Sequence, residues 1–265
     1  MIYINENARS KMKDWTDDTI HILADFDKTI TDSNSISSWG VLSKSTLVSK
    51  EYIKDRNEFY NYYYPFEIDQ TLDFETKNKL MIEWYTKHIN LFVKYKLSEN
   101  IVKDVAMNKS LMAFRKGAKE FLEDMNKRGI PVVIISAGIG NFVEQFLINN
   151  NCNFDNIYIV TNFIKFKNGI AVGVEDNIIH SLNKNEISIP SSVKEVIKNR
   201  PNIILLGDNI ADIRMATDDT REQAFKIGFL EDKVEENFSY YTEAFDVVCT
   251  DNTSYNELKE SVNLW

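Results

Sequence analysis

The chain carries several short, largely apolar runs rich in β-branched residues, each followed by a polar or small residue. The clearest are Ile20–Ala24, Pro131–Ile135 and Ile203–Leu206, and weaker examples are Ile157–Val160 and Phe245–Val248. Continuous apolar runs without polar alternation are typical of parallel strands that are buried on both faces. The pattern therefore predicts a parallel β-sheet made of these segments.

Helical periodicity fills the intervals between these runs, at Ala113–Arg128, Asn141–Asn150, Ser191–Asn199, Ile210–Thr217 and Glu231–Thr242. Strands that alternate with helices of this length predict right-handed βαβ crossovers, and so an α/β fold with a Rossmann-like core. One segment differs. In Phe163–His180, the dipeptide Asn168-Gly169 lies between two alternating runs, which predicts a β-hairpin.

Residues 33–112 interrupt the alternation, because their pattern is helical throughout and rich in aromatic residues. The expected helices are Ser45–Tyr64, Glu75–Tyr95 and Ser98–Asn108. We predict two domains, a core formed by residues 1–32 and 113–265 and an inserted, all-helical cap formed by residues 33–112.

Composition narrows the class of protein. The 265 residues are 43% hydrophobic and 27% charged, with nine glycines and four prolines, which predicts a globular chain without linkers. A net charge of −9 argues against a nucleic-acid polymer or an anionic membrane as partner. The sequence contains two cysteines, no apolar run long enough for a membrane span, and a polar start at Met1–Asp14. We therefore expect a cytoplasmic protein, of undefined oligomeric state.

Carboxylates follow two of the predicted strands. Asp25 and Asp27 close the first strand, and Asp208 and Asp212 follow the run at Ile203–Leu206. Ligands of open α/β sheets bind beyond the carboxyl ends of the strands, so these side chains are expected to converge. Like charges in one place require a cation or a shared proton, and oxygen-only ligands favour Mg²⁺.

Each candidate also has a structural interpretation when taken alone. Asp208 or Asp212 would serve as a helix N-cap, and Ser136 would cap a helix after the turn Ser136-Ala137-Gly138. Lys184 would be a solvated loop lysine. Together these residues are a more specific sign of a functional site than any one of them alone, because all of them occur in order along one α/β chain.

The ordered set resembles the four motifs of the haloacid dehalogenase (HAD) superfamily of aspartate-nucleophile phosphatases. The motifs are Asp25-Phe26-Asp27-Lys28-Thr29, Ser136, Lys184, and Asp208 with Asp212. The helical stretch after the first motif is similar to a C1-type cap of that superfamily. The resemblance implies a phosphomonoester hydrolase of the EC 3.1.3 class that works through an aspartyl-phosphate.

The resemblance also implies a role for each residue. Asp25 is the nucleophile, Asp27 the general acid and base, and Lys184 a catalytic cation. The phosphate would be bound by Ser136, Ala137, Gly138 and Lys184, and Mg²⁺ by Asp25, the Asp27 backbone carbonyl and Asp208. Asp212 and Thr29 would support the site.

The first motif also allows a second assignment of the nucleophile. Asp27-Lys28-Thr29 also resembles the Asp-Lys-Thr sequence of P-type ion pumps, in which Asp27 would attack. The pumps have Thr where this chain would place its second carboxylate. Because Asp27 supplies that carboxylate here and no membrane span is present, we assign Asp25 as the nucleophile.

A narrower resemblance covers the chain from Tyr62 onward. Glu83-Trp84-Tyr85-Thr86-Lys87, Ser136-Ala137-Gly138-Ile139-Gly140 and the segment from Ile179 to Asn185 are similar to the cytosolic pyrimidine 5′-nucleotidase (type III) family. That family reads the base with a cap glutamate, which nominates Glu67, and Glu67 would otherwise be a solvated loop carboxylate. The resemblance adds Trp84 to the base site, with His88 where the family tends to have Ser. Trp39 is the nearest candidate for a base-stacking aromatic.

The expected function is therefore Mg²⁺-dependent dephosphorylation of nucleoside 5′-monophosphates, with pyrimidines preferred. Two alternatives remain. One is an HAD phosphatase for another small phosphomonoester, either phosphoserine-like or 7-methyl-GMP. The other is a non-catalytic nucleotide-binding module, suggested by Gly138 and Gly140 after a strand, although a third glycine is absent at Val143.

Overall fold

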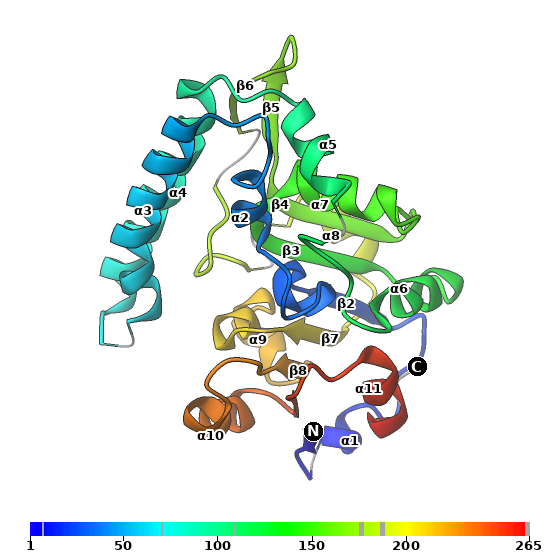
Figure 1. Cartoon of the computed structure of the whole chain (residues 1–265). Coiled ribbons are helices and arrows are strands. Elements are labelled where there is room, and N and C mark those ends of the chain that lie inside the picture. Colours follow the sequence, from blue (N-terminus) through cyan, green and yellow to red (C-terminus); the bar gives the residue numbers. More distant parts are fainter. Residues whose placement is uncertain (7, 70, 109, 175–177, 186–188, 263–265) are drawn as a thin grey trace.

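The computed structural model describes residues 1–6, 8–69, 71–108, 110–174, 178–185 and 189–262. A seven-stranded sheet forms the centre, in the order β1-β9-β8-β7-β2-β3-β4 (Figure 1). Every expected strand is present: β2 (Ile20–Ala24), β3 (Val132–Ile139), β4 (Ile157–Asn162), β7 (Asn202–Gly207) and β9 (Val247–Cys249). All neighbours are parallel except β1, which pairs antiparallel with β9. The predicted α/β fold with a parallel sheet is confirmed.

The sequence pattern did not predict strands β8 and β1. In β8 (Phe225–Phe229), Lys226 and Gly228 interrupt the apolar run, although the strand is almost entirely buried between β7 and β9. The edge strand β1 (Ile2–Ile4) is short and half-exposed, so it carries little hydrophobic signal. Pairing with neighbouring strands, rather than local pattern, defines both.

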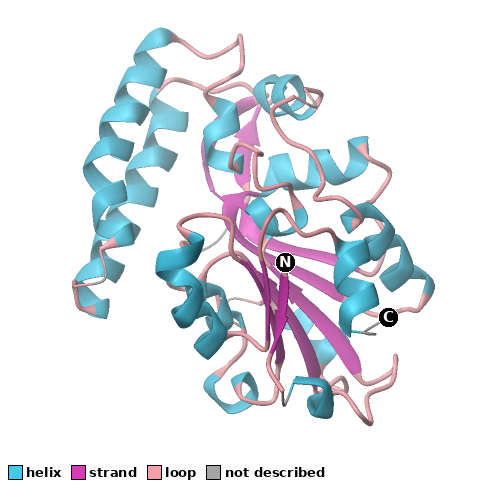
Figure 2. Ribbon diagram, turned by 60° about the horizontal axis from the view of Figure 1, so that its bottom comes forward, coloured by secondary structure: helices cyan, strands magenta, loops and turns pink. Residues whose placement is uncertain are grey.

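Helices cover both faces of the sheet (Figure 2). One face packs against α6 (Ala118–Lys127), α7 (Gly140–Asn149) and α11 (Tyr255–Val262), and the other against α8 (Ser191–Ile197) and α10 (Val234–Ala244). Successive residues of a strand point to opposite faces of the sheet. Ile22 and Ala24 of β2 therefore pack in the hydrophobic cluster with α6, α7 and α11, and Leu23 packs in the cluster with α8 and α10.

Several helix boundaries differ from the predictions. The segment predicted as a helix at Ile210–Thr217 is a 3₁₀ helix at Ile210–Met215, and α6 begins at Ala118 rather than Ala113. In the described part of the chain, the helices that were not predicted are short or terminal: α1 (Ala8–Lys11), the single turn at Phe26–Ile30, α2 (Ser38–Leu42), α9 (Asp218–Arg221) and α11. Helices of one or two turns carry too little periodicity to be recognised.

A helical insertion follows β2, as predicted. The long helices α3 (Lys50–Ile68) and α4 (Phe74–Lys94) stand as a pair beside the sheet, and α5 (Asn100–Ala106) returns to it (Figure 1). Thr31 and Phe114 form an isolated antiparallel bridge, so the two connections to the insertion lie together. We propose that the boundary between cap and core lies here.

The predicted hairpin is present as β5 (Ile164–Lys167) and β6 (Ile170–Val174). It reaches from the core to the cap, where Ile170 bridges Ser98 and the backbone N–H of Ala171 donates to Leu97 at 2.9 Å. The base of the cap, including Phe92 and Ile101, shares the main hydrophobic core. Farther out, Tyr63, Met81, Trp84 and Tyr85 form a separate cluster with Ala137 of the core.

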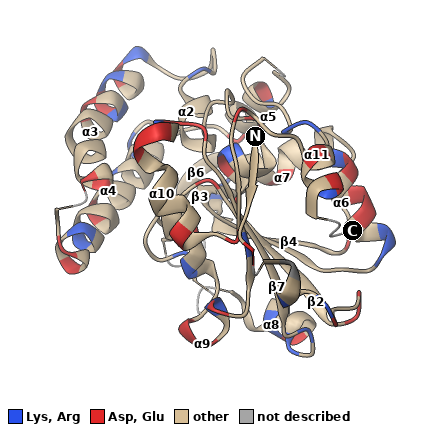
Figure 3. Ribbon diagram, turned by 90° about the horizontal axis from the view of Figure 1, so that it is seen from below, with Lys and Arg blue, Asp and Glu red and all other residues tan. Residues whose placement is uncertain are grey.

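Charged side chains of both signs lie next to one another on α3, α6 and α11 (Figure 3). Within the described ranges, the helices are either too short or too polar to cross a membrane.

The topology determines where a ligand can bind. The chain runs outward from β2 through β3 to β4, and then returns to the other side of β2 with β7. The carboxyl ends of β2, β3 and β7 therefore meet at a switch point, which is the usual ligand crevice of open α/β sheets.

Candidate active site

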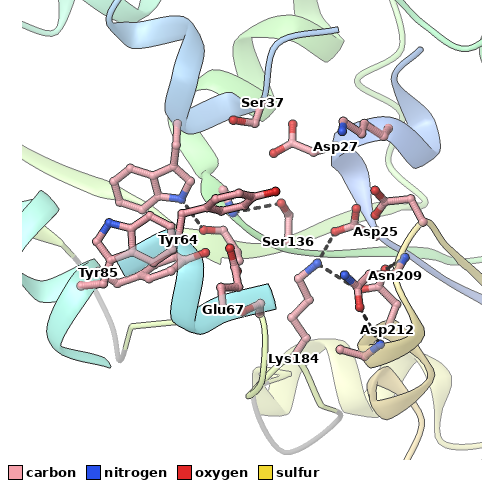
Figure 4. Close-up of a pocket in the computed structure, with 18 of the residues that line it drawn as sticks. Asp25, Asp27, Ser37, Tyr64, Glu67, Tyr85, Ser136, Lys184, Asn209 and Asp212 are labelled. Carbon is pink, nitrogen blue, oxygen red and sulfur yellow. Dashed lines mark hydrogen bonds and ion pairs between the residues drawn. The ribbon is translucent and has the colours of Figure 1, made fainter. Parts of the chain in front are cut away.

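A cavity of about 400 Å³ lies at this switch point, between the sheet and the cap helices (Figure 4). It brings together nearly all of the residues nominated from the sequence: Asp25, Asp27, Glu67, Trp84, His88, Ser136, Ala137, Gly138, Lys184, Asp208 and Asp212. Thr29 is the exception, since it is fully buried outside the cavity lining. The cavity has a charged floor at the strand ends and an aromatic chamber, defined as the part lined by cap residues.

Lys184 lies at the centre of the charged floor. Its Nζ donates to Asp25 Oδ1 at 2.5 Å and to Asp212 Oδ1 at 3.1 Å (Figure 4). The lysine is 8% exposed, so the solvated-loop interpretation is wrong. Hydrogen bonds to two carboxylates from different elements fix the ammonium at the floor of the cavity.

Asp212 has a second contact, because its Oδ2 accepts from the backbone N–H of Asn209 at 3.0 Å. Asn209 is the N-cap of the 3₁₀ helix and Asp212 completes its capping box. The helix-cap interpretation is therefore partly right for Asp212, which also binds Lys184, and wrong for Asp208, which precedes the cap. The Tyr241 hydroxyl holds the Asp208 backbone carbonyl at 2.6 Å.

Asp27 is held by a residue that the sequence did not nominate. The Ser38 backbone N–H donates to Asp27 Oδ1 at 3.0 Å, and the Ser38 hydroxyl donates to Asp27 Oδ2 at 2.9 Å. Ser38 is the first residue of α2, so the cap itself positions this carboxylate. Burial raises the pKa of Asp27, against the lowering effect of the two Ser38 hydrogen bonds. A raised pKa suits a carboxyl group that must carry a proton.

The carboxylates of the charged floor form a candidate cation site. One oxygen from each of Asp25, Asp208 and Asp212 lies within 4.8 Å of the others. Burial raises the pKa of Asp25 well above its ordinary value, and burial together with Asp212 raises that of Asp208 to about 7. Burial lowers the pKa of Lys184, but Asp212 and Asp25 outweigh it and hold the pKa well above its ordinary value. Burial and mutual repulsion make the charged form of these carboxylates unfavourable, and a divalent cation bound by their oxygens would stabilise it.

Close backbone packing explains two glycines at the floor. A Cβ on Gly207 would lie 2.5 Å from the Asp212 Cβ, and one on Gly138 would lie 2.1 Å from the Ser38 hydroxyl oxygen. Ser136 does not cap a helix as its structural interpretation required. It lies within β3, and its Oγ accepts from the Gly138 backbone N–H at 3.0 Å.

Thr29 belongs to a layer beneath the catalytic loop. Its carbonyl accepts from Arg115 Nε at 3.3 Å, and the Lys28 carbonyl accepts from Arg115 Nη2 at 2.5 Å. Arg115 is completely buried, pairs with Glu231 at 2.7 Å, and lies 4.2 Å from the centre of the Phe229 ring. This guanidinium connects the loop after Asp27 to the C-terminal part of the core.

The aromatic chamber surrounds Glu67. The rings of Tyr64 and Tyr85 lie near it in Figure 4, and the cavity lining also includes Trp39, Tyr60 and Trp84. Burial raises the pKa of Glu67, whereas Ser181, Lys184 and Lys77 lower it. Glu67 is therefore a half-buried carboxylate facing the cavity, and not the solvated loop residue of the alternative interpretation.

His88 lines the chamber beside Trp84. Its Nε2 accepts from Trp84 Nε1 at 3.2 Å, and its ring packs at 6.0 Å from the Phe59 ring centre. Burial, then the charge of Arg56, lowers the pKa of His88 to about 4. A neutral imidazole in this position fixes the orientation of the Trp84 indole.

The sequence missed several residues that line the same cavity: Ser37, Arg56, Tyr60, Tyr64, Ser181 and Asn209. Of these, Tyr60 and Tyr64 carry a signal, since they are four residues apart on α3 and their rings stack at 4.9 Å. No comparable signal marks Arg56 or Ser181, which reach the cavity only because the cap folds over the core.

The sequence model of a family described as "Pyrimidine 5'-nucleotidase (UMPH-1)" matches residues 21–263. The chain is also similar to curated proteins named "7-methylguanosine phosphate-specific 5'-nucleotidase". The protein from Drosophila melanogaster is 33% identical over 88% of this chain and 76% of the relative. The protein from Homo sapiens is 34% identical over 87% of this chain and 79% of the relative.

Solved structures are similar over nearly the whole chain. The crystal structure of cytosolic 5′-nucleotidase IIIB (cN-IIIB) bound to cytidine has a TM-score of 0.88 and 28% identity, covering 99% of this chain and 93% of that one. A substrate-bound phosphoserine phosphatase has a TM-score of 0.58 and 17% identity, covering 94% and 100%. The second similarity concerns the fold, which is the HAD phosphatase fold.

Proposed function

Because the chain belongs to the pyrimidine 5′-nucleotidase (UMPH-1) family, we propose that it hydrolyses nucleoside 5′-monophosphates with Mg²⁺, pyrimidine nucleotides preferred, in the cytoplasm. As a member of that family it is a 5′-nucleotidase hydrolase. One observation carries the proposal. A single cavity joins the buried pair of Asp25 and Lys184 to an aromatic chamber that contains Glu67.

Asp25, Asp208 and the Asp27 backbone carbonyl would hold the Mg²⁺. The Asp212 carboxylate belongs to the same cluster of oxygens but already accepts from Lys184 and Asn209. When bound, the cation neutralises the repulsion between the carboxylates and a phosphate dianion.

The two carboxylates of the first motif have different roles, since Asp25 is the nucleophile and Asp27 transfers protons. One oxygen of Asp25 accepts from Lys184, so the other is available to attack phosphorus and form an aspartyl-phosphate. Asp27 gives its proton to the leaving 5′-oxygen of the nucleoside, and then takes a proton from the water that attacks the intermediate. Hydrolysis releases phosphate and restores Asp25. Ser38 holds Asp27 in place for both steps.

The phosphate oxygens would be bound by Ser136, Lys184 and the backbone N–H groups of Ala137 and Gly138. Ser136 and Lys184 are buried, and both line the cavity beside Asp25. Fixed donors in a site shielded from water stabilise the charge that develops on the transferring phosphoryl group.

Glu67 would recognise the base by accepting a hydrogen bond from an N–H group, such as the amine of cytosine. The Ser181 hydroxyl acts on Glu67, whose pKa it lowers, and lines the same cavity. It would offer a second polar contact to the nucleoside. Aromatic walls suit a planar base, which favours a nucleotide over a substrate of phosphoserine size.

The second candidate substrate is 7-methyl-GMP, which the names of the curated relatives suggest. Its base carries a positive charge, and a carboxylate among aromatic rings is a suitable environment for such a cation.

An initial-rate panel tests the proposal, using CMP, UMP, 7-methyl-GMP, phosphoserine and p-nitrophenyl phosphate with Mg²⁺ or with EDTA. We expect Mg²⁺-dependent hydrolysis with CMP among the best substrates and phosphoserine at least about tenfold poorer in kcat/KM, a difference of 1.4 kcal/mol. Equal, low rates on every compound would contradict nucleotide specificity. Full activity in EDTA, after exhaustive dialysis against it, would contradict the metal requirement.

A further inference from the structure

Arg56 brings a positive charge to the aromatic chamber. It projects from α3, and the described residues offer it no carboxylate within ion-pair distance. Its Nη1 donates to Asn57 Oδ1 at 3.0 Å, and its buried Nε lacks a hydrogen-bond partner. The guanidinium lies 5.4 Å from the centre of the Tyr60 ring. A buried N–H group without an acceptor is costly, so its retention in a ligand cavity points to an acceptor supplied by the ligand.

Arg56 is half-buried and has different neighbours from Lys184, which is buried at the floor of the same cavity. A Cβ on Gly40 would lie 3.8 Å from Arg56 Nη2, so the guanidinium faces α2. Arg56 also contributes to the low pKa of His88, whereas Lys184 and Lys77 are the cations that act on Glu67. The cavity therefore has a cation at its catalytic floor, a carboxylate in the chamber, and a second cation near His88.

We propose that Arg56 is a specificity-determining residue, which donates to a carbonyl oxygen of a neutral pyrimidine base and disfavours a base that carries a positive charge. This inference rests on the proposed function, since it requires a nucleoside in the chamber. Cytosine and uracil offer carbonyl oxygens that a guanidinium can bind with its fixed N–H donors. A 7-methylguanine cation would instead meet a like charge in a partly desolvated cavity. Arg56 thus shifts selectivity toward CMP and UMP and away from 7-methyl-GMP.

The test compares Arg56→Leu, Arg56→Lys and the matched control Lys54→Gln. Lys54 lies on the same helix, is exposed, and pairs with Glu58 outside the cavity. The readouts are kcat/KM for CMP, UMP, 7-methyl-GMP and p-nitrophenyl phosphate, with the thermal midpoint of each variant. For Arg56→Leu, we expect the ratio of kcat/KM for CMP to that for 7-methyl-GMP to fall at least tenfold. The loss on CMP should also exceed that on p-nitrophenyl phosphate at least tenfold.

Arg56→Lys keeps the charge and loses the planar donors, so it should still discriminate against 7-methyl-GMP while losing part of its activity on CMP. Lys54→Gln should leave every ratio within twofold of the wild type. An unchanged CMP to 7-methyl-GMP ratio in Arg56→Leu overturns the inference. Equal losses on all four substrates also overturn it, because they indicate a structural role. If the wild type hydrolyses p-nitrophenyl phosphate but no nucleotide, the proposed function itself fails, and the role of Arg56 fails with it.

Discussion

The charged floor and the aromatic chamber of the cavity are built in opposite ways. At the floor, Lys184, Asp25 and Asp212 come from three separate segments of the core, and each is less than a tenth exposed. In the chamber, Tyr60 and Tyr64 are more than a third exposed and belong to a helix pair beside the sheet. Most charges of the floor are held by hydrogen bonds or ion pairs, as Lys184 is by Asp25 and Asp212, whereas the chamber consists mainly of aromatic rings with the charged residues Glu67 and Arg56.

Under the proposed function, this difference gives the two regions separate tasks. A phosphoryl group requires donors and carboxylates that are already held in position, so we expect the floor to act on any phosphomonoester. Recognition of one base among several requires a few contacts that others fail to satisfy, and we expect the chamber to provide these. Substitutions at the floor should therefore reduce every activity, while those in the chamber should alter selectivity.

Asp25→Asn should have the largest effect, because it removes the nucleophile. We expect turnover to fall by at least about 10⁴-fold on CMP and on p-nitrophenyl phosphate alike. The thermal midpoint without metal should stay the same or rise, since one of several clustered carboxylates is neutralised. Steady-state rates and thermal melts measure both. Wild-type turnover would exclude Asp25 as the nucleophile.

Arg115→Met should weaken the buried interactions that hold the loop after Asp27 beneath the floor. The variant removes the partner of Glu231 and the donors to the Lys28 and Thr29 carbonyls, so we expect the free energy of unfolding to fall by about 3–5 kcal/mol. Turnover at a temperature where the variant is folded should fall equally on nucleotides and on p-nitrophenyl phosphate. Denaturant titration measures the loss of unfolding free energy. A loss below about 1 kcal/mol would mean that the buried pair contributes little. The exposed pair of Lys79 and Glu75 supplies a control, through Lys79→Met.

Glu67→Gln should separate the two regions most directly. Loss of the carboxylate should lower kcat/KM about 10–100-fold on CMP, and less than about threefold on p-nitrophenyl phosphate, which has no base to be read. Glu75→Gln, an exposed carboxylate of α4, is the matched control. Parallel losses on both substrates would place Glu67 in the catalytic machinery instead of the chamber.

The smallest effect concerns pH. Burial lowers the pKa of His88 in the chamber and of His21 in the sheet to about 4, below the ordinary value of 6.5. The unfolded chain therefore binds protons first as the pH falls, so stability is fully present above pH 6.5 and is lost toward pH 4. Each histidine should cost about 2 kcal/mol of unfolding free energy between pH 7 and pH 5.

The variants His88→Gln and His21→Gln test this expectation by denaturant titration at several pH values. Both should flatten the dependence of stability on pH. Only His88→Gln should also change the kinetics with nucleotides, because His88 holds Trp84 in the chamber and His21 lies in β2. A steep pH dependence that persists in both variants would assign it to other groups.

The sequence allowed the strands of the core to be predicted well, and with them the positions of Asp25, Ser136 and Asp208. Buried parallel strands carry a strong local signal, and topology then brings their carboxyl ends together. Edge strand β1 and strand β8 were missed, because the first is short and the second contains Lys226 and Gly228. Their place is defined by pairing with β9 and β7.

Contacts between cap and core were not predictable in the same way. The hydrogen bonds of Ser38 to Asp27, and that of the Trp39 indole to the Ala137 carbonyl at 2.7 Å, join segments that no local pattern relates. Arg115 is a similar case. It is fully buried, but the sequence around an arginine does not show whether its side chain will be buried or exposed. Such interactions depend on the way the insertion packs on the sheet.

The amino-acid sequence alone determined the fold class, the order of the candidate catalytic motifs and the oxygen-rich character of the candidate metal site. These follow from hydrophobic period and residue type, which act over a few neighbouring residues. The tertiary structure decided how each charge is balanced, which residues line the chamber, and where Arg56 points. These properties depend on burial and on distances between segments far apart in the chain, and neither is set until the cap has packed against the core.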